Sequence, residues 1–180
     1  MTPGPDFIIV GQGLAGSVLA LNLIEAGAKV EVFDCQLLGR SSSVSQGLVN
    51  SISGLRLNIP WAWEPAAFES LQFFTGFEQV VSKKLIKKRN CIRLFRSLNQ
   101  KAIFEKNCLN RVYQKLVKKV SSPGEIIDIE DNFGSFTTQT YQVDVKAFLC
   151  CVKHILIEKQ AYRKEKFDYS SVSIDKETVS

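Results

Sequence analysis

Three glycines near the start of the chain stand at the spacing GxGxxG, at positions 11, 13 and 16. At this spacing a glycine allows a tight turn after a strand, lets an anion approach the backbone, and lets a helix pack closely on the strand. The first amides of a helix lack intrahelical partners, and the helix dipole adds partial positive charge there. Gly11, Gly13 and Gly16, with Leu14 and Ala15 between them, therefore predict a loop that binds a diphosphate.

An acidic residue follows this loop at a distance suited to a ribose ligand. Asp34 lies 18 residues after Gly16 and closes a short apolar segment. Its carboxylate can accept hydrogen bonds from ribose hydroxyls and would repel a 2′-phosphate, so an unphosphorylated dinucleotide is favoured. The alternative is a glycine-rich turn that binds nothing.

A strand, a helix and a second strand must position these residues. Residues 7–10 are an uninterrupted apolar run, which is typical of a strand buried on both faces. Residues 14–26 have the pattern of a helix, and Gly27 can end it in the left-handed conformation. Residues 29–33 alternate and predict the second strand. The chain therefore opens with a βαβ unit of Rossmann-like α/β type.

Composition limits the classes of function. The chain has 180 residues, of which 45% are hydrophobic, enough for one domain with a core. The net charge is +5, and many of the basic residues fall between positions 83 and 93. We expect that cluster to be a solvated face that follows a helix, because no interleaved aromatic residues indicate nucleic-acid binding.

Other features indicate a cytoplasmic protein without a membrane span. The five cysteines are odd in number and form no CxxC pair, so we expect reduced thiols and no metal centre. Residues 7–24 carry no charge, but glycines and polar residues interrupt them and Asp6 precedes them, which argues against a membrane span or a signal peptide.

The segment after Asp34 holds three consecutive hydroxyl side chains and then a Gln-Gly-Leu triplet. Hydroxyls can bind phosphate or sugar, and a glycine lets the backbone run close to a flat group. The residues are Ser41, Ser42, Ser43, Gln46, Gly47 and Leu48. Together with the glycine motif, this segment resembles the FAD-dependent oxidoreductases of the D-amino-acid-oxidase-like family, which includes glycine oxidase and sarcosine oxidase.

The resemblance implies FAD as cofactor, with the serines beside its phosphates and the backbone of residues 46–48 near the isoalloxazine ring. It also implies a parent enzyme that oxidises an amine or an amino-acid-like substrate by hydride transfer to the flavin. Members of the family resemble this chain in a glycine-basic turn before a tryptophan. Arg56, in that turn, can pair with a substrate carboxylate, or it is an ordinary surface arginine. No catalytic residue is assigned.

The rest of the chain predicts the start of an inserted α+β substrate domain and a return to the FAD-binding fold. We expect a helix over 66–82, with Trp61 and Trp63 as packing anchors, a strand over 90–95, short strands over 125–143 and a helix from 145 to about 160. The predicted domains are 1–84, the first segment of the FAD-binding domain; 85–143, a partial substrate domain; and 144–180, the returning segment.

The family has about half of its length still to come where this sequence stops. We therefore expect the N-terminal portion of a larger flavoenzyme, with a complementary C-terminal chain if the protein is split. Two alternatives stay open. One is an inactive remnant that only binds a dinucleotide, and the other is an NAD-dependent enzyme, in which the serine-rich segment would be incidental.

Overall fold

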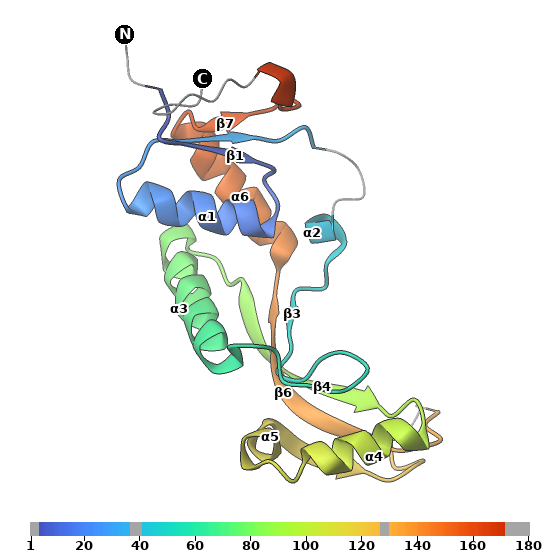
Figure 1. Cartoon of the computed structure of the whole chain (residues 1–180). Coiled ribbons are helices and arrows are strands. Elements are labelled where there is room, and N and C mark those ends of the chain that lie inside the picture. Colours follow the sequence, from blue (N-terminus) through green and yellow to red (C-terminus); the bar gives the residue numbers. More distant parts are fainter. Residues whose placement is uncertain (1–3, 37–40, 127–129, 172–180) are drawn as a thin grey trace. The chain divides into compact units, whose positions relative to one another are not determined.

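The computed structural model describes residues 4–36, 41–126 and 130–171, which form two compact units (Figure 1). The first unit is Met1–Ser45 with Val145–Ser180, and the second is Gln46–Asp144. The second unit thus takes in residues 46–84, which the sequence analysis assigned to the FAD-binding domain. The functional assignment of that segment stays a prediction.

The first unit is a parallel sheet with helices, as predicted for a Rossmann-like fold. Its elements are β1 (Phe7–Val10), α1 (Leu14–Glu25), β2 (Val30–Phe33), α2 (Ser41–Val44), α6 (Val145–Glu158), β7 (Tyr162–Arg163) and the 3-10 helix η1 (Tyr169–Ser171). The strand order is β1-β2-β7, and both pairings are parallel. Because α1 connects two neighbouring parallel strands, the predicted βαβ unit is confirmed.

The core of the first unit lies between the sheet and its helices. Ile9 and Val32 are paired across β1 and β2, and both are buried. From α6 the buried side chains are those at helical spacing: Val145, Phe148, Val152 and Leu156. This stripe and the predicted extent of the helix are confirmed, because residues three and four apart lie on one helix face.

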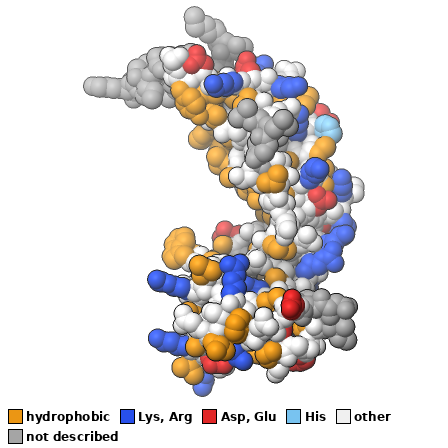
Figure 2. Space-filling model, turned by 90° about the vertical axis from the view of Figure 1, so that its right-hand side faces the viewer, with side chains coloured by type: hydrophobic (Ala, Val, Ile, Leu, Met, Phe, Trp, Pro, Cys, Tyr) orange, Lys and Arg blue, Asp and Glu red, His pale blue; other side chains and the backbone are white. Residues whose placement is uncertain are grey.

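The prediction that β1 is buried on both faces is wrong for this structure. Phe7, Ile8 and Val10 are 47%, 41% and 47% exposed, and only Ile9 of this strand is buried. Within the described residues β1 is an edge strand, paired with β2 on one side. Apolar side chains reach the surface of this unit, the upper part of Figure 2.

The second unit is built on an antiparallel sheet around a long strand. Its elements are β3 (Leu48–Val49), α3 (Trp63–Val81), β4 (Ile86–Leu94), α4 (Leu98–Asn107), α5 (Arg111–Leu116), β5 (Val117–Ser121) and β6 (Ser135–Val143). Strand β6 pairs with all three other strands, and its pairing with β4 runs along the whole of both. One strand of nine residues thus replaces the end of the predicted run of short strands, whose residues 127–129 lie outside the described residues.

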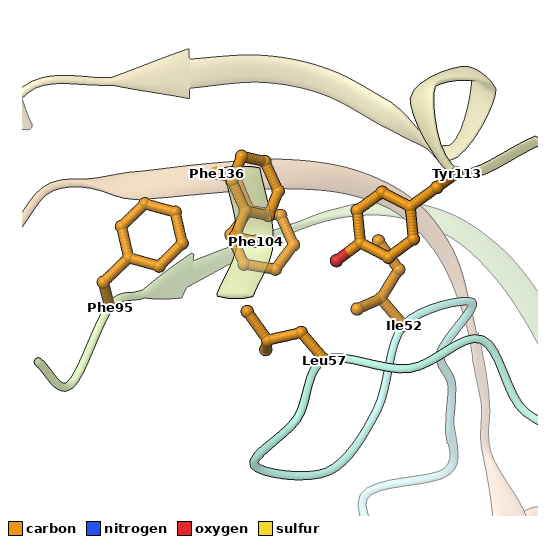
Figure 3. Close-up of a cluster of buried hydrophobic side chains, with 6 residues drawn as sticks. All are labelled: Ile52, Leu57, Phe95, Phe104, Tyr113 and Phe136. Atoms are coloured by element: carbon orange, nitrogen blue, oxygen red, sulfur yellow. The ribbon is translucent and has the colours of Figure 1, made fainter. Parts of the chain in front are cut away.

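An aromatic cluster forms the core of the second unit (Figure 3). The rings of Phe104 and Phe136 are stacked 4.6 Å apart, and Phe95 lies 5.4 Å from Phe136. Ile52, Leu57 and Tyr113 complete the buried set. Such ring contacts add to the stabilisation from burying apolar area, so this cluster holds α4, α5 and the sheet together.

One residue of the second unit corrects a prediction made from the sequence. Trp61 is 96% exposed, so it is not a packing anchor in this structure. The basic cluster is largely exposed and follows a helix, as expected: Lys83 and Lys84 lie between α3 and β4, and the other residues of the cluster lie on β4. Lys87 and Lys88 are exposed there, and Lys and Arg side chains are spread over this unit in Figure 2. Charged side chains on a sheet edge oppose pairing with another strand.

Unlike the exposed residues of that basic cluster, Arg93 contacts other parts of the second unit. Its guanidinium donates to the carbonyls of Ile52 and Gly54, at 2.6 and 3.2 Å, and lies 5.8 Å from the centre of the Phe136 ring. It therefore attaches the 52–54 turn to the sheet.

In the described part of the chain, no helix combines the length and apolar character that crossing a bilayer requires.

Candidate functional site

The turn between β1 and α1 has the geometry that its glycines predict. Gly11 has a φ of +101°, a conformation that favours glycine. A Cβ on Gly16 would lie 2.1 Å from the carbonyl oxygen of Gly11 and 3.3 Å from a methyl carbon of Ile9. Helix α1 therefore packs against the end of β1 only because position 16 has no side chain.

The serine-rich segment reaches the start of α1. Leu14 N–H donates to the hydroxyl oxygen of Ser42 over 3.0 Å, and a Cβ on Gly13 would lie 3.1 Å from that oxygen. An oxygen atom thus already accepts a hydrogen bond from a first-turn amide, at the end of the helix that attracts anions. The sequence analysis predicted both parts of this contact, and the structure brings them together.

Gln12, inside the glycine motif, was not singled out as a site residue. Its side chain is buried and donates to the hydroxyl of Ser17 at 3.1 Å and to the carbonyl of Leu149 at 2.9 Å. The loop is thereby attached to both α1 and α6. The only sequence signal was a polar residue in an otherwise small and apolar stretch, which does not reveal a partner 137 residues away.

Asp34 lies at the carboxyl end of β2 and is only 5% exposed. Its Oδ2 accepts a hydrogen bond from the hydroxyl of Tyr162, over 3.3 Å, and that hydroxyl accepts one from the side-chain amide of Gln36, over 2.9 Å. The backbone N–H of Asp34 also donates to the carbonyl of Arg163. Strand β7 therefore helps to place the acid that the sequence predicted as a ribose ligand.

The remaining predicted site residues fall into two groups. Ala15 is exposed on the first turn of α1, and Ser41 and Ser43 are exposed on α2, all in the first unit. The others belong to the second unit: Gln46, Gly47, Leu48 and Arg56.

The second-unit residues are held mainly through their backbones. Gly47 has a φ of +66°, and its carbonyl accepts from Val143 N–H at 2.8 Å. The carbonyl of Gln46 accepts from the Gln142 side chain. Arg56 is exposed, and its carbonyl accepts from Asn107.

The chemistry of the first-unit residues fits a dinucleotide. Amides at the start of α1, a backbone without a side chain at Gly13 and a hydroxyl at Ser42 suit a diphosphate, and the carboxylate of Asp34 suits a sugar. No group of His, Cys, Asp and Glu in the described ranges is arranged to hold a metal ion.

Fold and loop together define a dinucleotide-binding α/β protein. A model of the family described as "FAD dependent oxidoreductase" matches residues 6–161. The chain belongs to this family, whose cofactor is FAD, and the predicted resemblance is confirmed. The NAD-dependent alternative receives no support from the comparisons. No curated protein sequence is similar enough to count as a match.

Solved structures of several enzymes share the fold. Iminodiacetate oxidase from Chelativorans sp. BNC1 is 15% identical with a TM-score of 0.69, and the match covers 96% of this chain and 49% of that one. L-Amino acid deaminase from Proteus myxofaciens is 11% identical with a TM-score of 0.61, covering 91% and 38%. L-alpha-Glycerophosphate oxidase from Mycoplasma pneumoniae, solved with FAD bound, is 13% identical with a TM-score of 0.57, covering 88% and 44%. The chain thus spans about half or less of the length of these proteins.

Proposed function

We propose that this chain is the FAD-binding part of an oxidoreductase, with the diphosphate of FAD at the amino end of α1. The single observation that carries the proposal is the contact between Leu14 N–H and the Ser42 hydroxyl beside the bare backbone of Gly13. It brings an amide and a hydroxyl together beside a backbone position that has no side chain.

Ser42 changes its role when the diphosphate binds. Its oxygen accepts a hydrogen bond from Leu14 N–H in the structure, as a phosphate oxygen would. A phosphate oxygen is charged and forms the stronger bond with that amide. The Ser42 hydroxyl then rotates and donates to the phosphate. Gly11, Ala15 and Gly16 shape the loop, and Ser41 and Ser43 supply further hydroxyls.

The sugar and the flavin use other residues. Asp34 accepts hydrogen bonds from the adenosine ribose, and the backbone of Gln46, Gly47 and Leu48 approaches the isoalloxazine ring. Support for the second assignment is the left-handed φ of Gly47, which a side chain would disfavour. FAD supplies the hydride acceptor for oxidation, and the protein binds and orients it.

We further propose an amine or amino-acid-like substrate for the whole enzyme. Iminodiacetate oxidase and L-amino acid deaminase, by their names, act on such compounds and share this fold. The guanidinium of Arg56 is exposed and offers a two-point contact for a substrate carboxylate.

Five free thiols among the described residues favour a reducing compartment, and we propose that the protein lies in the cytoplasm.

The exposed β1 surface supports a proposal about a further part of the flavoenzyme. Ile8 and Val10 form an exposed apolar strip on one face of the edge strand β1, and Phe7 is exposed on the other face. Such a surface is the kind that another strand or layer covers. The solved relatives contain as much protein again as this chain matches. We propose that the corresponding part of the flavoenzyme, in the same chain or in a complementary C-terminal chain, covers this strip.

The test of cofactor binding is a comparison of the wild-type chain with Gly13→Val. The wild type is expected to bind added FAD, measured by quenching of flavin fluorescence. The variant is expected to lose binding because a branched side chain would crowd Ser42 and block the approach of the diphosphate to the backbone. Gly76→Val, in the open middle of α3, is the control and should retain binding. Equal FAD affinity in the wild type and Gly13→Val would overturn the assignment.

The second candidate, a remnant that binds a dinucleotide without catalysis, is favoured by the limited coverage of the solved relatives. Co-expression with the protein encoded next to this chain separates the two. Amine-dependent reduction of the flavin in the combined protein indicates a split or larger enzyme. Bound FAD that no amine reduces indicates the remnant.

A further inference from the structure

Three hydrogen-bonded polar side chains form a network at the carboxyl end of β2, beside β7. It consists of the side-chain amide of Gln36, the hydroxyl of Tyr162 and the carboxylate of Asp34, joined by hydrogen bonds of 2.9 and 3.3 Å. Asp34 and Tyr162 lie 128 positions apart in the sequence.

The direction of the two hydrogen bonds in this network is fixed by the chemistry of the three side chains. An ionised carboxylate only accepts, and a side-chain NH₂ only donates. Because Gln36 donates to the Tyr162 oxygen, the phenol proton is free to point at Asp34. The two bonds therefore act in the same direction, and each strengthens the other.

The backbone and one cation hold Tyr162 at this place. Tyr162 pairs with Val32 in the parallel register of β2 and β7, so its side chain shares a sheet face with that of Asp34, two residues further on. The ammonium of Lys153 lies 5.2 Å from the centre of the Tyr162 ring, within the range of a cation–π contact. Gln36 has a φ of +54°, a left-handed turn immediately beyond the acid.

We propose that Tyr162 is a positioning residue for recognition of the adenosine ribose, acting through Asp34. This inference rests on the proposed function. A carboxylate has about four acceptor sites, and the bond from Tyr162 is made to Oδ2 of Asp34. By fixing the Asp34 rotamer before the cofactor arrives, the phenol removes part of the ordering cost of binding.

The first arm of the test measures affinity for FAD and for ADP, which carries the adenosine half alone. Tyr162→Phe retains the ring and removes the hydroxyl. It is expected to weaken the binding of both ligands by about 3- to 10-fold, less than for direct loss of a hydrogen bond to a charged group, because the hydroxyl acts on the ligand through Asp34. Tyr141→Phe, which removes a phenol hydroxyl from β6 in the second unit, is the matched control and should change neither affinity.

The second arm separates positioning from a general loss of stability. In an Asp34→Asn background, Tyr162→Phe is expected to change the FAD affinity less than 2-fold, because the bond through which it acts is already altered. A denaturant-unfolding cycle of the same four proteins without ligand should show coupling between positions 34 and 162.

The outcomes are distinct. Unchanged ligand affinity in Tyr162→Phe, an equal loss in the Asp34→Asn background, or no coupling in the unfolding cycle overturns the role of Tyr162 while the proposed function stands. A wild-type chain that binds neither FAD nor ADP overturns the proposed function and, with it, this inference.

Discussion

Gly16 shows how much a single position contributes to the first unit. The hypothetical Cβ at this position meets the carbonyl oxygen of Gly11, a backbone atom that cannot move aside cheaply. Glycine at this position is therefore required for the packing of α1 on β1. The same close approach also places the amino end of the helix at the loop.

We expect Gly16→Ala to prevent normal packing of α1 and to lower the free energy of unfolding severely, because overpacking against backbone forces the helix away from the strand. Chemical denaturation followed by circular dichroism measures the change. The matched control is Gly76→Ala in α3, where the added Cβ meets no atom within 4 Å. It should stabilise the chain by about 0.4–1 kcal/mol, since alanine loses less entropy on folding. Similar effects of the two substitutions would contradict this account.

Gln12 and Tyr162 act at the same scale but through distant partners. The side chain of Gln12 donates to Leu149, and that of Tyr162 donates to Asp34. Each bond therefore connects a segment of the candidate site to the part of the chain after residue 144. The candidate diphosphate and ribose contacts are therefore both supported by α6 and β7. The βαβ unit alone would leave Gln12 without its bond to Leu149 and Asp34 without its bond to Tyr162.

Among the elements, the connection from α3 to β4 depends on a buried carboxylate. Glu78 is 6% exposed and accepts from the backbone N–H groups of Leu85 and Ile86 and from the ammonium of Lys84. The backbone bond from Ile86, followed by that from Leu85 and the contact with Lys84, lowers the pKa of Glu78 against the opposing effect of burial. The carboxylate thus fixes the point at which β4 starts.

Because the pKa of Glu78 is lower in the folded chain than in the unfolded chain, its ionised form adds stability above the usual glutamate pKa. That stability is lost as the pH falls through the lowered value. We expect Glu78→Gln to reduce the free energy of unfolding by about 1 kcal/mol at neutral pH. The difference from wild type should vanish in acid.

Urea denaturation at a series of pH values measures this difference. Glu69→Gln, at an exposed position of the same helix, is the control and should show no such pH dependence. A wild-type-minus-variant difference for Glu78 that stays constant down to the most acidic pH would refute the assignment.

For the molecule as a whole, the distribution of exposed apolar side chains determines whether the isolated chain associates. Ile8 and Val10 are neighbours on one face of the edge strand β1, and Phe7 is exposed on the other face, whereas Val80 is an exposed apolar residue on a helix. Scattered exposed apolar residues are normal, but contiguous ones mark a surface that another part of a protein covers. The β1 strip therefore predicts association or aggregation of the isolated chain.

We expect Val10→Lys to reduce binding of an apolar fluorescent dye and aggregation of the isolated chain, because the charge interrupts the strip and blocks edge pairing. Val80→Lys, at a 73% exposed position of α3, is the control and should have little effect. Light scattering and dye fluorescence measure both. If the two variants behave alike, the β1 strip is not the surface responsible.

Local sequence signals determined much of this protein. The glycine spacing, the apolar run before it, the helix pattern after it and the acid at position 34 predicted the βαβ unit and its fold class, because each depends on residues close together in the chain. The apolar stripe from Val145 to Leu156 was predicted in the same way. The serine-glycine segment favoured FAD, and the family match agrees.

Long-range pairing decided the rest. That β7 lies beside β2, that β6 pairs with three strands, and that Gln12 and Asp34 have partners on α6 and β7 depend on contacts between residues far apart in sequence. The apolar run of β1 likewise predicted a buried strand, but burial depends on which neighbours are present. Periodicity and spacing carry no information about such partners, so only the tertiary structure could supply them.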